Sequence, residues 1–96
     1  MTYQASQPAG LISVLLDSSA PFGDRHDAAM DLGHFNASEA EAALLQVVLN
    51  LAEDSDIADA AGESLRSIWS RTGKYDTKLT QSFHPEARKF FPDPRA

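Results

Sequence analysis

Residues 11–17 read LISVLLD and residues 44–50 read LLQVVLN, so one apolar pattern occurs twice, 33 positions apart. In the same register, Ala28 matches Ala61 and Leu32 matches Leu65. Each copy predicts an apolar helix, a short acidic turn, and a second helix with small residues and a leucine four positions later. A helix pair cannot bury its apolar face alone, and small residues let neighbouring backbones approach closely. The pattern therefore predicts two helix pairs that lie side by side.

Capping signals predict where the helices begin and end. Asp24 is suited either to cap the start of a helix over residues 24–33 or to place a negative charge there. Gly33 is suited to a left-handed end of that helix. Ser38 and Glu41 have the spacing of a capping box, which predicts the start of the next helix. The many apolar residues that follow predict that this helix is buried on most sides.

The second half of the chain carries a further helical pattern from residue 57 onward. Four apolar residues recur at helical spacing and predict a helix that Gly73 closes, with Trp69 in the core: Ile57, Ala61, Leu65 and Ile68. Asp76 is suited to cap a short turn, and Pro85 to begin a last helix that Pro92 ends. No run of alternating strand residues occurs, so the predicted fold class is all-α.

We expect one domain over residues 1–96, because a chain of 96 residues is too short for two independent cores. Its predicted parts are a flexible leader (1–8), repeat one (9–35), repeat two (37–73) and a C-terminal capping segment (75–96). The capping segment would cover an apolar end of the helices with Phe83, Phe90 and Phe91.

Charge is divided unevenly along the chain. Residues 1–65 contain one basic and eleven acidic residues, whereas residues 66–96 contain seven basic and three acidic residues. An acidic body repels phosphate backbones, so we expect no nucleic-acid binding and instead a basic protein partner. The basic tail is expected to pack, solvated, against the acidic body.

Composition excludes several classes of protein. The chain has no cysteine, so a disulfide scaffold and a thiolate zinc site are excluded. It has no apolar run of about 18 residues, and its first residues do not have the pattern of a secretory signal. We therefore expect a cytoplasmic protein that does not associate with membranes.

No arrangement of residues predicts catalysis, a cofactor or a metal. The three histidines, His26, His34 and His84, do not lie one helical turn apart, as metal ligands on a helix would. Residues 54–59 begin like a calcium loop, but Ala58 and Asp59 stand where a ligand and a glycine are required. We expect no enzymatic activity, no cofactor and no metal site.

The second helix of each copy resembles the HEAT-repeat family, whose pattern is roughly V-R-x-x-A-A-x-x-L-G. The first copy matches it at Arg25, Ala28, Ala29, Leu32 and Gly33, and the second at Ile57, Ala61 and Leu65, with Gly62 in place of an alanine. Asp24 and Ala58 depart from it. The resemblance implies a short stack of antiparallel helix pairs with a C-terminal capping helix, and a plain helix bundle is the alternative.

Two stripes of carboxylates are the candidate partner-binding residues. Asp24, Asp27 and Asp31 share one helix face, and Asp56, Asp59 and Glu63 repeat that spacing at an offset of 32, which rotates them by about 100°. Glu53 and Asp54 extend the acidic region, and Phe22, in a Pro-Phe-Gly turn, either fills a gap or projects toward a partner. Ordinary solvated helix starts are the alternative, although they do not account for Asp31 and Glu63.

In size, charge and architecture, the chain resembles bacterial immunity proteins. That resemblance implies a protein that binds and occludes a cognate toxin domain, of the basic, nuclease type, and that is a monomer or a weak dimer. A small adaptor that self-associates through an exposed edge at Leu11, Val14 and Leu15 is the alternative, and an enzyme accessory is a third.

Overall fold

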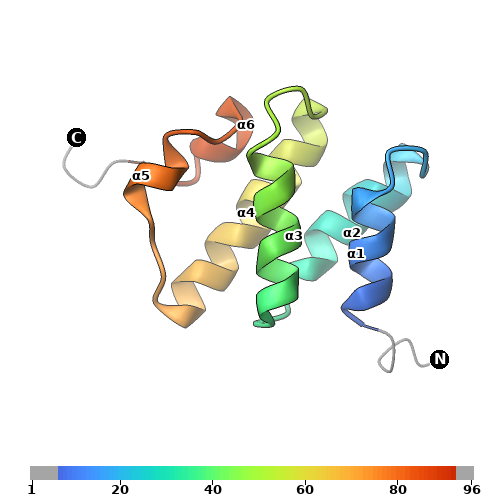
Figure 1. Ribbon diagram of the computed structural model, residues 1–96, viewed down its shortest axis with the longest axis horizontal. Coiled ribbons are helices and arrows are strands. Elements are labelled where there is room, and N and C mark those ends of the chain that lie inside the picture. The colour runs from blue at the N-terminus through green and yellow to red at the C-terminus, as the bar shows by residue number, and fades with distance from the viewer. Residues whose placement is uncertain (1–6, 93–96) are drawn as a thin grey trace.

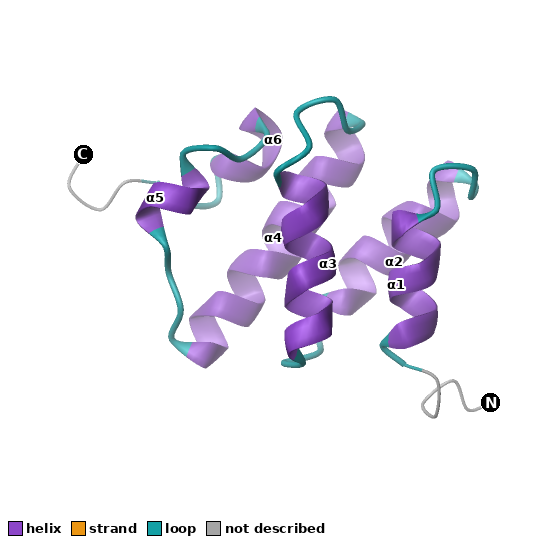
Figure 2. Ribbon diagram, in the orientation of Figure 1, coloured by secondary structure: helices purple, strands orange, loops and turns teal. Residues whose placement is uncertain are grey.

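The computed structural model describes residues 7–92, and this part of the chain is helical, without a strand (Figures 1 and 2). The all-α prediction is therefore confirmed. The helices are α1 (Ala9–Leu16), α2 (Phe22–Leu32), α3 (Ser38–Val48), α4 (Ser55–Thr72), α5 (Thr77–Thr80) and α6 (Pro85–Arg88). Most of the predicted leader and the last four residues of the capping segment lie outside the described residues.

The four longer helices form two layers. In Figure 2, α1 and α3 lie nearer the viewer, and α2 and α4 lie behind them. α1 packs on α2, α3 packs on α4, and α2 and α4 pack on each other in the rear layer. The Cα atoms extend over 45 × 27 × 14 Å, and the short dimension fits two layers of helices whose axes lie about 8–10 Å apart. None of the helices in residues 7–92 is long and apolar enough to span a membrane.

Residues that match at the offset of 33 form much of the core between the four longer helices. Ala28 and Ala61 are buried, and so are Leu32 and Leu65. Leu15 and its counterpart Val48 are completely buried as well. α4 has the most buried residues because α2, α3 and α6 all pack against it: Ile57, Ala58, Ala60, Ala61, Gly62, Ser64, Leu65, Ile68 and Trp69.

Two glycines bring helix backbones into close contact. A Cβ atom on Gly33 would lie 2.7 Å from the hydroxyl oxygen of Ser64 on α4, and one on Gly62 would lie 2.6 Å from the Cα atom of Ala87 on α6. The Ser64 hydroxyl also donates a hydrogen bond of 2.6 Å to the carbonyl of Ala29 on α2. α4 is therefore held between α2 on one side and α6 on the other.

The prediction of a left-handed end at Gly33 is wrong. Gly33 has φ −63°, a right-handed conformation that any residue adopts. The position requires glycine because Ser64 leaves no room for a side chain. Gly73 does end α4 in the left-handed conformation, with φ 79°, as its place after the apolar pattern predicts.

Replacing Gly62 with alanine is expected to lower the free energy of unfolding by about 1–2 kcal/mol, because the new methyl group displaces the backbone of α6. The gain in helix propensity, about 1 kcal/mol, offsets only part of this cost. The matched control is Gly23→Ala, since nothing lies within 4 Å of a Cβ atom there. Urea unfolding followed by the fluorescence of Trp69 measures both. Equal stability of the two variants would show that α6 does not pack closely on Gly62.

The predicted capping box is also wrong. The N-cap of α3 is Ala37, whose side chain makes no cap hydrogen bond, and Ser38 is already the first helical residue. Glu41 does not reach back to the helix start, because its carboxylate accepts hydrogen bonds from Trp69 Nε1 and Lys74 Nζ, both at 2.8 Å. A tertiary contact therefore takes the side chain that the local pattern assigns to capping.

The other helix ends agree with the sequence in part: α2 begins at Phe22, two residues before the predicted start, and Asp24 lies in its first turn and not at its cap. Asp54 caps α4 by accepting hydrogen bonds from the backbone N–H groups of Asp56 and Ile57. Asp76 caps α5, and Pro85 is the first residue of α6. α6 is shorter than predicted and ends at Arg88, so Phe90 and Phe91 follow it.

The tail of the chain packs against the acidic body, as its charge predicts. Lys74 pairs with Glu41 on α3, and Lys89 pairs with Asp59 on α4. Trp69 is 3% exposed and is therefore a core residue, as predicted. Its indole packs against three rings of the tail, with centroid distances between 5.4 and 6.2 Å: Tyr75, Phe83 and Phe91.

Candidate protein-binding surface

Glu53 forms the most buried ion pair in the described chain. Its two carboxylate oxygens accept hydrogen bonds from Arg25 Nη1 at 3.2 Å and Nη2 at 2.7 Å, and the side chains are only 14% (Arg25) and 10% (Glu53) exposed. Arg25 Nε also donates to the carbonyl of Leu15 at the end of α1. Burial alone would raise the pKa of Glu53, but hydrogen bonds from Arg25 and the Asp54 N–H, with the Arg25 charge, hold it below its ordinary value.

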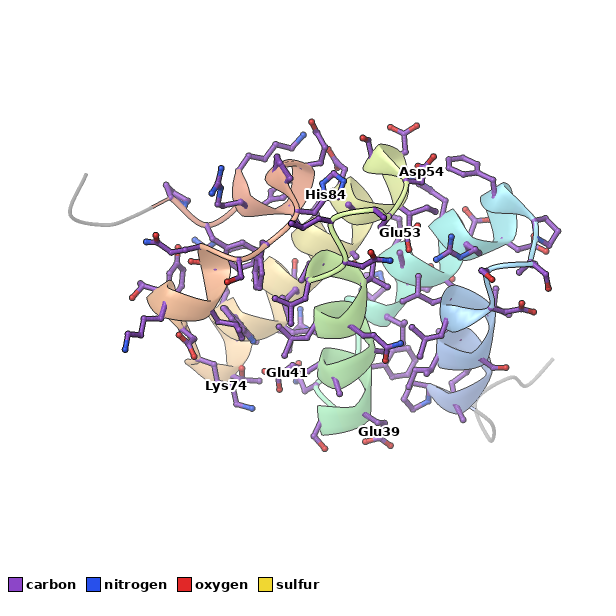
Figure 3. All side chains as sticks on the ribbon, turned by 45° about the horizontal axis from the view of Figure 1, so that its top comes forward. Glu39, Glu41, Glu53, Asp54, Lys74 and His84 are labelled. Carbon is purple, nitrogen blue, oxygen red and sulfur yellow. The ribbon has the colours of Figure 1, made fainter. Side chains whose placement is uncertain are left out.

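The backbone of Glu53 continues this polar network to the tail. His84 Nε2 lies 3.1 Å from the Glu53 carbonyl, and His84 Nδ1 accepts a hydrogen bond from the N–H of Glu86. These partners assign the proton of the imidazole to Nε2. Figure 3 shows Glu53 and His84 close together beside the turn between α3 and α4. Glu53 therefore joins α2, this turn and α6, and its carboxylate is directed at Arg25 of the same chain.

Asp54 also has a structural role, because its carboxylate holds the first backbone N–H groups of α4. It differs from Glu53 in being exposed. Its negative charge therefore still contributes to the field at this end of α4, although its hydrogen bonds are directed at its own helix.

The α2 stripe (Asp24, Asp27 and Asp31) is exposed. Asp27 and Asp31 each lie two positions from Ala29, which contacts α4, and two positions on a helix correspond to a turn of about 200°. Both therefore point away from α4. Their counterparts at the offset of 33 are Ala60 and Ser64, which are buried.

The α4 stripe (Asp56, Asp59 and Glu63) lies on a different side. Asp59 and Glu63 are each two positions from the buried Ala61, so they point away from the core, to the rear of α4. Asp59 is engaged by Lys89, and the hydrogen bonds that the Lys89 ammonium donates to Asp59 and then to Glu86 raise the pKa of Lys89 to about 12. Asp56 and Glu63 are exposed, and within residues 7–92 neither forms an ion pair.

A row of larger side chains lies on α2, beside the α4 stripe. Phe22 is the first residue of α2, not part of a turn, and it is 51% exposed, so it projects outward. Its ring lies 5.8 Å from that of His26, and Met30, four positions further, is 40% exposed. At the offset of 33, His26 corresponds to Asp59 and Met30 to Glu63. The row of Phe22, His26 and Met30 therefore faces the same way as the α4 stripe.

We use the term rear face for these two rows together: Phe22, His26 and Met30 on α2, and Asp56, Asp59 and Glu63 on α4. The spacing of the acidic residues alone does not reveal His26 and Met30. The offset of 33, applied to every position of α2, would have placed both residues on this face.

A groove of about 550 Å³ lies beside Trp69 and Tyr75. Its two carboxylates are already engaged, Glu41 by Trp69 and Lys74 (Figure 3), and Asp76 by the N–H of Leu79. Between residues 7 and 92, no three His, Cys, Asp or Glu side chains gather closely enough to hold a metal ion.

The edge that would support self-association is not exposed. Leu15 is fully buried, and Leu11 and Val14 are half-buried against the core.

No protein-family model, curated protein or solved structure matches this chain. The geometry of the two stripes and the rear face is thus the basis for assigning a function.

Proposed function

We propose that this chain is a non-catalytic protein-binding module whose partner is a basic protein. One observation carries the proposal: five carboxylates on the neighbouring helices α2 and α4 are exposed, and the described part of the chain gives none of them an ion-pair partner. They are Asp24, Asp27, Asp31, Asp56 and Glu63. Four other acids are engaged by cations of the same chain: Glu41, Glu53, Asp59 and Glu86.

The proposed architecture is a short HEAT-like stack of antiparallel helix pairs with a C-terminal cap. Its support is the burial of matched residues at the offset of 33 and the series of contacts from α2 to α4 and from α4 to α6. Ala29 on α2 contacts Ser64 of α4, and its counterpart Gly62 on α4 contacts Ala87 of α6. α6 thus takes the place that the second helix of a third pair would occupy.

The partner that best complements this surface is a toxin domain with a basic, phosphate-binding cleft, which the chain would occlude as an immunity protein. Carboxylates attract such a cleft over a distance and raise the association rate, while they repel the nucleic acid that the toxin binds. This role places the protein in the cytoplasm, where a nuclease toxin meets its substrate.

The test is the salt dependence of association with a partner isolated from the native strain. We expect the association rate constant to fall at least tenfold between about 50 and 500 mM salt, because salt screens the attraction between exposed charges. An association rate that salt does not change would contradict the proposal.

Two variants test which carboxylates contribute to binding. Asp31→Lys with Glu63→Lys should weaken binding by more than tenfold, about 1.4 kcal/mol. Glu39→Lys, at the exposed start of α3 in the other layer (Figure 3), should have a much smaller effect. The double variant changes the net charge by four and Glu39→Lys changes it by two, so an effect of Glu39→Lys half as large in free energy would mean that only net charge matters and not the position of the carboxylates.

A further inference from the structure

We infer that the rear face is a docking site for an amphipathic helix of the partner, one with a row of lysine or arginine beside a row of apolar side chains. This inference rests on the proposed function and adds to it which face binds and what kind of segment it receives. It follows from the combination of two unlike rows on neighbouring helices, and not from the carboxylates alone.

The apolar row needs an apolar partner. Phe22 and Met30 are among the few large hydrophobic residues of the described chain that are exposed, at 51% and 40%. They lie eight positions apart on α2, with His26 between them, so the row is about 12 Å long. Covering such side chains with apolar atoms is favourable, and aromatic residues are frequent among those that dominate binding energy.

The acidic row beside it selects the charge of that partner. Asp56 and Glu63 lie seven positions apart on α4, so this row is about 10 Å long and runs beside the apolar one. The axes of packed helices are about 8–10 Å apart, and a helix with its side chains is about 10–12 Å wide. A partner helix of two to three turns that rests on the seam between α2 and α4 therefore contacts both rows.

The chain itself shows that this face accepts a lysine. The ammonium of Lys89 binds Asp59 at the α6 side of the row, and its side chain lies 5.5 Å from the centre of the Phe90 ring. A lysine on the partner would repeat this contact at Asp56 and Glu63, beside α2. An anionic membrane or nucleic acid is negatively charged, as these carboxylates are, and would be repelled by them.

The experiment uses the full chain, labelled with ¹⁵N, and two synthetic peptides of 14 residues at low salt. One peptide places lysines and leucines in adjacent rows of a helix, and the other has the same composition in scrambled order. We expect the first peptide to bind at least tenfold more tightly and to shift the amide signals of residues 22–31 and 55–63. Signals that shift instead on the α1 and α3 layer would overturn the inference.

Variants separate the two rows. Phe22→Ser with Met30→Ser and, separately, Glu63→Lys should each weaken binding of the first peptide by about tenfold, whereas Glu39→Lys should have little effect. All of these residues are exposed, and circular dichroism checks that helix content is unchanged. Equal binding of both peptides, with no effect of the serine variant, would overturn the docking site but leave binding by charge intact. Absence of binding by either peptide would contradict both proposals.

Discussion

Replacing Trp69 with alanine is expected to lower the free energy of unfolding by about 3–5 kcal/mol, the usual cost of removing a large buried aromatic side chain. The indole is 3% exposed and contacts the rings of Tyr75, Phe83 and Phe91. It also donates a hydrogen bond to Glu41 on α3. Its loss therefore weakens the attachment of the tail to α4. Urea unfolding followed by circular dichroism measures the change.

The matched control for Trp69 is Leu51→Ala, because Leu51 is a large apolar residue that is 66% exposed. Its replacement should change the stability by no more than about 0.5 kcal/mol. Limited trypsin digestion gives a second measurement, since Lys74 and Lys78 lie in the segment that Trp69 holds. We expect faster cleavage there in the Trp69 variant. A loss of stability below about 1 kcal/mol would mean that the tail does not depend on this side chain.

Replacing Glu53 with leucine is expected to cost about 3 kcal/mol, because it leaves the nearly buried Arg25 guanidinium without its carboxylate. In the double variant Arg25→Met with Glu53→Leu, much of this loss should be recovered, since no charge is then left unpaired. Lys74→Ala is the matched control. Lys74 is 58% exposed in its ion pair with Glu41, and such pairs contribute about 0–1 kcal/mol. Urea unfolding of the four proteins compares them.

The same ion pair makes the stability depend on pH. Folding holds the pKa of Glu53 below its ordinary value of 4.5, so the folded chain binds fewer protons there than the unfolded chain does. The stabilisation is therefore complete above about pH 4.5 and is lost as the pH falls through the lower, folded pKa. The double variant should lose less stability over this acid range than the natural chain. The same loss in both would show that Glu53 does not contribute to it.

The two-layer arrangement of α1 to α4 was predictable because it depends on a pattern that recurs. Leu15, Ala28 and Leu32 match Val48, Ala61 and Leu65 in sequence, and all six are buried. A recurring set of apolar and small residues constrains which faces pack together, so one offset specifies many contacts. The two acidic stripes lie 32 positions apart, one fewer than the apolar pattern, and this difference predicts the rotation of about 100° between them.

The helix ends were less predictable, because several residues can serve either a local or a tertiary contact. Glu41 has the spacing of a capping residue but bonds to Trp69, 28 positions away. Gly33 has the place of a helix end but is required by Ser64. In both cases, a partner distant in sequence decides the role, and no local signal reveals it.

The candidate site was predictable in composition but not in detail. Whether a carboxylate is free depends on whether a cation of the same chain reaches it, and Arg25 and Lys89 reach Glu53 and Asp59 across 28 and 30 positions. The sequence shows that acids outnumber bases in the body, but it does not show these pairings. The role of Phe22 also depended on where α2 begins, one residue after Pro21.

The outward direction of Asp27 and Asp31 has a consequence for what can pack against this side of α2. On α4 the corresponding residues are Ala60 and Ser64, whose small side chains permit α2 to pack closely. The two aspartates of α2 would have to lose their hydration before a neighbouring helix could pack against them. A helix is therefore costly to pack against this side of α2. A protein engineer who wished to add a helix here would first exchange these aspartates for the alanine and the serine that occupy the matching positions of α4.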